Sequence, residues 1–107
     1  MSDASTRRYE ARTRIIRAMA SPTRLMLVAE LTQNDERCVC ELAALVEADV
    51  STVSRHLLIL RQAGIIDEER RGKMTYYHIR SPVVQRFFDF AECCLRQASA
   101  EQEEMAV

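Results

Sequence analysis

Apolar residues recur at helical spacing over most of the chain, and this pattern predicts a mainly helical protein. Ser21 followed by Pro22 is typical of a helix start with proline at its first position, and Gly64 is typical of a helix end. A polar loop at 32–37 and a short connector at 48–50 separate the middle segments. We therefore expect helices at about residues 10–19, 21–31, 39–46, 51–63 and 81–98.

The stretch after Gly64 has a different pattern. A charged run ends at Arg71, Gly72 follows, and Met74–Ile79 is rich in aromatic and β-branched residues, which predicts a β-hairpin. The two short helices before this hairpin, joined by a tight link, have the helix-turn-helix pattern, in which the second helix enters the DNA major groove. We therefore expect an α+β fold, mainly helical with one small hairpin, of the winged helix-turn-helix type.

A chain of 107 residues with 48% hydrophobic content is in the size range of one compact domain. We therefore expect a single domain over 1–107, with flexible tails at 1–9 and 99–107. A core built by one chain of this length is marginal, and both terminal helices carry apolar residues. For these reasons we expect a homodimer formed through the N- and C-terminal helices.

The formal net charge of −1 does not indicate a nucleic-acid binder, because overall basicity is the usual sign of one. The distribution of the charge is more informative. Between Val50 and Arg80 basic residues outnumber acidic ones, whereas Glu101, Glu103 and Glu104 form an acidic end. The basic charge is thus local to the helix-turn-helix and the hairpin.

The fourth predicted helix carries short hydrogen-bond donors and an arginine away from its apolar side. Ser51, Thr52, Ser54 and Arg55 are therefore expected to face DNA base edges. The alternative interpretation is an ordinary solvated helix face.

Three basic residues flank the glycine of the predicted hairpin: Arg70, Arg71 and Lys73. The turn brings them together, so we expect them to contact DNA phosphates and to position the protein on the duplex. The alternative is a basic turn that only keeps the strand edges soluble.

Several segments together resemble the ArsR/SmtB family of metal- and metalloid-responsive repressors, over about residues 10–95. The resemblance implies a winged-helix repressor of transcription that binds double-stranded operator DNA. It also implies that His56 lies in a motif at the DNA surface, although a packed or hydrogen-bonded histidine is the alternative. The segments are Ala20–Leu25, Cys38–Leu42, Ser54–Leu57, and Arg71–Lys73 with Tyr76 and Tyr77.

Four cysteines, spaced as Cys38 with Cys40 and Cys93 with Cys94, are expected to be free thiols, metal ligands or redox sensors in a reducing cytosol. Cys38 and Cys40 lie at a helix start, where the first residue is not yet helical, so their sulfurs can converge. A helix N-terminus also favours the thiolate that soft ions and oxidants require. Buried structural cysteines are the alternative interpretation.

The resemblance implies that Cys38 and Cys40 belong to a site for a thiophilic inducer, arsenite (As(III)) first, with Sb(III), Cd(II) or Pb(II) as other ions. The arsenic-binding version of this motif has a third cysteine where this chain has Ala43. Cys93 and Cys94 are therefore the expected additional donors. They either complete one site shared with Cys38 and Cys40 or form a second site of their own. The family's zinc site on the C-terminal helix has no counterpart, because neither histidine lies after Ser81.

No stretch is long and apolar enough to span a membrane and the first residues lack the apolar core of a signal peptide, so we expect a cytoplasmic protein without a membrane partner. No motif indicates an enzyme or an organic cofactor. One alternative keeps the DNA binding but makes oxidation or persulfidation of the thiols the signal. A remote alternative is a thiol-disulfide enzyme or a metal carrier, for which the scaffold is wrong.

Overall fold

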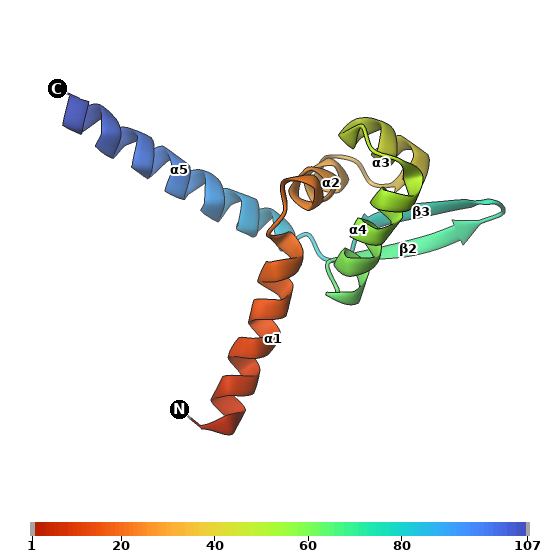
Figure 1. The fold of residues 1–107 in the computed structure, drawn as a ribbon, viewed down its shortest axis with the longest axis horizontal. Coiled ribbons are helices and arrows are strands. Elements are labelled where there is room, and N and C mark those ends of the chain that lie inside the picture. Colours follow the sequence, from red (N-terminus) through yellow and green to blue (C-terminus); the bar gives the residue numbers. More distant parts are fainter. Residues whose placement is uncertain (1, 107) are drawn as a thin grey trace.

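The computed structural model describes residues 2–106, and it confirms the winged helix-turn-helix architecture (Figure 1). Helices α3 and α4 form the helix-turn-helix, and strands β2 and β3 form the hairpin, called the wing below. In chain order the elements are α1 (Asp3–Met19), α2 (Pro22–Gln33), β1 (Arg37–Cys38), α3 (Val39–Val46), α4 (Val50–Gln62), β2 (Ile66–Arg71), β3 (Met74–Ile79) and α5 (Val84–Ala106).

The two segments expected to be flexible tails are helical instead, over 3–9 in α1 and 99–106 in α5. At the start of α1 the Ser2 hydroxyl accepts a hydrogen bond from the Ser5 N–H at 3.3 Å, and Asp3 lies at the positive end of the helix dipole. The end of α5 is rich in alanine, glutamate and glutamine, which are strong helix formers. Met1 and Val107 lie outside the described residues.

The sheet has one strand more than the sequence predicts. The hairpin pairs from Ile66 with Ile79 to Arg71 with Met74, and Gly72 turns the chain with a φ of 61°. β1, which falls at the end of the expected 32–37 loop, adds itself to the other edge of β3, so the strand order is β1-β3-β2.

The core lies where α2, α3 and α4 meet the sheet. The faces that these elements share are apolar and exclude water, which is the main source of their stability. The largest fully buried side chains are Leu27, Val28, Leu42, Val53, Leu57, Leu60 and Ile66.

Helices α1 and α5 leave this body in different directions, and the far part of each projects away from it (Figure 1). Large apolar side chains on them are exposed: 58% for Ile16 on α1, and 68% for Phe90 and 63% for Leu95 on α5. No helix among the described residues combines the length and apolar composition needed to cross a membrane.

Candidate nucleic-acid interface and cysteine sites

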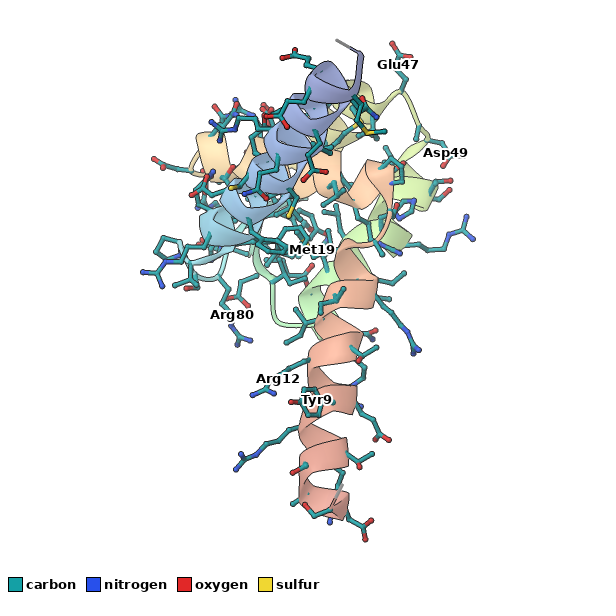
Figure 2. The ribbon with its side chains drawn as sticks, turned by 90° about the vertical axis from the view of Figure 1, so that its left-hand side faces the viewer. Tyr9, Arg12, Met19, Glu47, Asp49 and Arg80 are labelled. Atoms are coloured by element: carbon teal, nitrogen blue, oxygen red, sulfur yellow. The ribbon has the colours of Figure 1, made fainter. Side chains whose placement is uncertain are left out.

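Helix α4 begins at Val50, one residue earlier than the sequence predicts. Asp49, not Ser51, caps the helix: its carboxylate accepts hydrogen bonds from the Thr52 N–H at 2.8 Å and from the Ser51 hydroxyl at 3.2 Å. These bonds, those of Thr52 foremost, lower the pKa of Asp49. Before it, Glu47 ends α3 with a φ of 53°, and Figure 2 shows both acidic residues at this turn.

The predicted base-facing residues lie off the buried side of α4. Ser51 and Arg55 are exposed, while Thr52 and Ser54 are half-buried on the flanks. The opposite side of the helix carries the core residues Val53, Leu57 and Leu60. The helix therefore presents three hydroxyls and a guanidinium at its N-terminal end, the end that a recognition helix offers to the major groove, with the Ser51 hydroxyl proton donated to Asp49.

His56 is half-buried at the edge of the same helix. Its Nδ1 atom is buried and has no hydrogen-bond partner among the described residues. A contact of His56 with DNA thus stays a prediction.

The three basic residues of the wing differ in their surroundings. Arg70 and Lys73 are exposed at the tip, and the Arg70 Nε donates only a long hydrogen bond to the Gly72 carbonyl at 3.4 Å. Neither forms an ion pair with another described residue. No carboxylate of the described residues engages either side chain, and their contact with phosphate stays a prediction.

Arg71 is already occupied. Its guanidinium donates to both carboxylate oxygens of Glu36, at 2.6 and 2.7 Å, and to Glu69 at 3.0 Å. The same group lies 4.7 Å from the centre of the Tyr76 ring. These hydrogen bonds lower the pKa of Glu36 and Glu69 and raise that of Arg71. The contact of Arg71 with phosphate stays a prediction, with two carboxylates competing for it.

Cys38 and Cys40 have different environments. Cys38 is buried and caps α3 with an extended backbone, as expected for the residue before the helix, whereas Cys40 is exposed in the first turn. The Cys38 N–H donates to the Glu41 carboxylate at 3.1 Å, and this bond is the main reason that the pKa of Glu41 is lowered. Three residues after Cys40, Ala43 is packed in the core.

Cys93 and Cys94 are exposed on α5, the helix whose far part projects from the body (Figure 1). Within residues 2–106, no group of three or more His, Cys, Asp or Glu side chains comes close enough to hold a metal ion. One chain alone therefore does not bring the two cysteine pairs into a common site.

Two residues of this region are absent from the sequence predictions. Asp49 had a local signal, since an aspartate three positions before a backbone N–H of the next helix is typical of a cap. Glu36 had none, because its partner Arg71 lies 35 residues away along the chain.

Comparison with known proteins gives matches over most of the chain. The sequence model described as "Bacterial regulatory protein, arsR family" matches residues 21–68. The arsenical resistance operon repressor of Bacillus subtilis is 33% identical over 95 residues, which cover 89% of this chain and 88% of that protein.

The cadmium resistance transcriptional regulatory protein CadC of Listeria innocua is 38% identical over 63 residues, 59% of this chain. The match covers 53% of that protein, so the chain spans about half the length of this relative. Among solved structures, a homodimeric winged helix-turn-helix DNA-binding domain from Mycobacterium bovis, a possible ArsR-family regulator, has a TM-score of 0.81 at 26% identity. The similarity covers 94% of this chain and 93% of that one.

Proposed function

The chain belongs to the ArsR family of bacterial regulatory proteins, and from this we propose that it is a transcriptional repressor that binds operator DNA as a homodimer. The repressor leaves the operator when its cysteine thiolates bind a soft metal or metalloid, arsenite foremost. The similarity to the B. subtilis arsenical resistance operon repressor, which extends over nearly the whole of both chains, is the observation that carries this function.

DNA recognition rests on α4 and the wing. The N-terminal end of α4 enters the major groove, where Ser51, Thr52, Ser54 and Arg55 are placed to meet base edges. Arg70 and Lys73 contact phosphates beside the groove and set the position of the helix along the duplex. An overall charge of −1 is compatible with this role, because α4 carries two arginines and no acidic residue and the tip of the wing adds Arg70, Arg71 and Lys73.

The second copy of the chain supplies the second recognition helix. The exposed apolar side chains of Ile16, Phe90 and Leu95 support dimerisation through α1 and α5, because apolar surface of this kind is stabilised by a partner. The M. bovis domain of the same fold is homodimeric. A two-fold dimer binds two half-sites about one helical turn, roughly 34 Å, apart.

We assign the binding of the inducer to the thiols of the four cysteines. Thiolates are soft ligands, and As(III), Sb(III), Cd(II) and Pb(II) are the thiophilic ions that such a set would bind. Because the described residues of one chain do not gather three donors, the third thiolate has to come from the other cysteine pair after a rearrangement or from the second subunit. Cys38 and Cys40 are one half of the donor set, and Cys93 and Cys94 the other.

A release assay tests the function. Reduced protein is bound to a fluorescent duplex from the region upstream of its own gene and titrated with arsenite, cadmium and zinc while anisotropy is recorded. We expect release by arsenite, and loss of this response in Cys38→Ser or Cys93→Ser, with DNA affinity unchanged. Ser99→Ala, an exposed change on α5, is the control variant. Failure to bind the duplex, or equal release in every cysteine variant, contradicts the proposal.

A second candidate function is favoured by the lack of a three-donor cluster in the described residues: a redox-responsive repressor of the same fold needs only two thiols. Two thiols and hydrogen peroxide would give one disulfide and two molecules of water. With an organic hydroperoxide the products would be one disulfide, one water and one alcohol. In both cases two electrons pass from sulfur to the peroxide oxygen. Anaerobic titration separates the candidates. Arsenite releases a metalloid sensor whose thiols are all reduced, whereas a redox sensor responds only to the oxidant.

A further inference from the structure

A hollow of about 560 Å³ lies between α1, the first turn of α2 and the last turn of α4. Three arginines line it, Arg14 and Arg17 from α1 and Arg24 from α2, together with the amide side chain of Gln62 from α4. No carboxylate is among the described residues that line it. The hollow is therefore a cationic site bounded by three different helices.

Some arginines of the domain body are paired with carboxylates and others, Arg55 and Arg70 among them, are not. Arg37, Arg61, Arg71 and Arg80 each form an ion pair with a carboxylate. No described residue forms an ion pair with the three arginines of the hollow, although they converge on one space. Converging like charges repel each other unless an anion lies between them.

Arg24 is the arginine of the hollow that has a buried donor without a hydrogen-bond partner. Its Nε atom is buried and has no hydrogen-bond partner among the described residues, and an unpaired buried donor on a charged group is costly. Arg24 also lies in the first turn of α2, which contains no acidic residue to offset the positive end of the helix dipole.

We propose that this hollow binds a small oxyanion of the phosphate type. A guanidinium presents its N–H donors as a planar fork, which matches the oxygens of phosphate with two parallel hydrogen bonds. Arg24 is the half-buried cation of the site, Arg14 and Arg17 contribute the exposed cations, and Gln62 can donate from its amide. The site is distinct from the cysteines and from the DNA-facing end of α4.

The anion has two possible sources, a free oxyanion or a backbone phosphate of DNA. Ile59, Gln62 and Ala63 place the hollow at the C-terminal end of α4, whereas Ser51 marks the groove-facing end. Gln62 lies eleven positions after Ser51 in the helix, a distance of roughly 16 Å at about 1.5 Å per residue. This separation favours the free oxyanion.

The test is a titration of the reduced full-length protein with inorganic phosphate, in chloride buffer of constant ionic strength, followed by calorimetry and by the melting temperature. The variants are Arg24→Gln, Arg14→Gln and Arg17→Gln. Arg12→Gln is the matched control, because it removes the same charge from α1 at a residue that does not line the hollow and whose guanidinium lies 5.3 Å from the Tyr9 ring (Figure 2). The salt dependence of binding to a mixed-sequence duplex is measured on the same set.

We expect saturable phosphate binding that raises the melting temperature in wild type and Arg12→Gln. Arg24→Gln should weaken it about tenfold or more, as loss of a charge-assisted hydrogen bond does. If Arg24→Gln is unstable, the exposed Arg14→Gln and Arg17→Gln give the same test. A salt slope lowered by about one in these variants, without binding of free phosphate, assigns the site to the DNA backbone. Equal behaviour of all variants and the control in both assays overturns the proposal.

Discussion

Cys38 lies directly opposite Tyr76 in the antiparallel pairing of β1 with β3. The first cysteine of the proposed inducer site is therefore part of the sheet that carries the wing. The Tyr76 ring in turn lies against the Arg71 guanidinium, which holds Glu36, two residues before Cys38. A change at the thiol has a short physical path to the wing that does not pass through α4.

This pairing predicts where the inducer acts. If a ligand draws Cys38 out of β1, the two-residue strand loses its pairing, since so short a strand has few hydrogen bonds to hold it. We expect amide hydrogen exchange at Arg37 and Tyr77, the other residue pair of β1 with β3, to become faster when arsenite binds the reduced protein. Exchange in the β2–β3 part of the hairpin serves as the internal reference. Unchanged exchange at both amides would place the coupling elsewhere.

Arg55→Gln should weaken binding to the operator about tenfold, because an arginine that reads a base edge makes one of the strongest specific contacts. Binding to mixed-sequence DNA should change much less, so the specificity ratio falls. Fluorescence anisotropy at a fixed salt concentration measures both affinities. Arg86→Gln, an equal loss of charge at an exposed position of α5, is the control. An equal fall on both duplexes would make Arg55 a phosphate contact.

The three basic residues of the wing should differ in their effect on the salt dependence of DNA binding, because only Arg71 is paired with carboxylates. Lys73→Gln and Arg70→Gln should each lower the salt slope of DNA binding by about one, as expected for the loss of one phosphate contact. Arg71→Gln should lower it less, since Glu36 and Glu69 already neutralise this guanidinium. The slope is obtained from operator affinity at several chloride concentrations. A larger effect for Arg71 than for Lys73 would show that DNA displaces the two carboxylates.

Acid should lower the stability of the folded protein through the ion pairs of Arg71 with Glu36 and Glu69. Hydrogen bonds from Arg71 hold the pKa of Glu36 and Glu69 below their ordinary value of 4.5. In the range below 4.5 the unfolded chain then binds more protons than the folded chain, so stability is present above this pH and is lost as the pH falls. Melting curves recorded by circular dichroism across this range measure the loss. The double variant Glu36→Gln with Glu69→Gln should show a shallower loss, and an equal slope would assign the acid sensitivity to other groups.

A charge on the exposed apolar face of the terminal helices should break the proposed dimer. Leu95→Glu and Ile16→Glu are expected to shift the protein towards monomer, because an unpaired carboxylate in an apolar interface is costly. Sedimentation velocity gives the oligomeric state, and operator affinity should fall with it. Leu45→Glu, at an exposed apolar position of α3, is the control for oligomeric state. A dimer that survives both changes would contradict an interface on α1 and α5.

The helices and the hairpin could be predicted because their signals are local. α3 begins and ends where the apolar spacing places it, and Ser21 caps α2 with Pro22 in the first turn as predicted. The hairpin follows from Gly72, which stands between a charged run and a stretch of aromatic and β-branched residues. Each of these features is decided by a few neighbouring residues.

Features decided across the chain could not be predicted in this way. β1 has two residues, too few to show an alternating pattern, and exists because β3 offers it an edge. The different states of Arg70 and Arg71 depend on Glu36, which the chain brings to the wing only in the folded structure. The partners of the exposed cysteines belong to the same class, since no local pattern sets the distance between α3 and α5.

Ala43 restricts how this chain could acquire a different specificity in evolution. It is 5% exposed and faces the core, so a cysteine placed there would begin with its sulfur among aliphatic side chains rather than beside Cys40. A third thiolate from α3 would require the helix to rotate or unwind as well as the mutation itself. The exposed α5 carries no such restriction, and donor residues can be gained or lost there one at a time without disturbing the folded body.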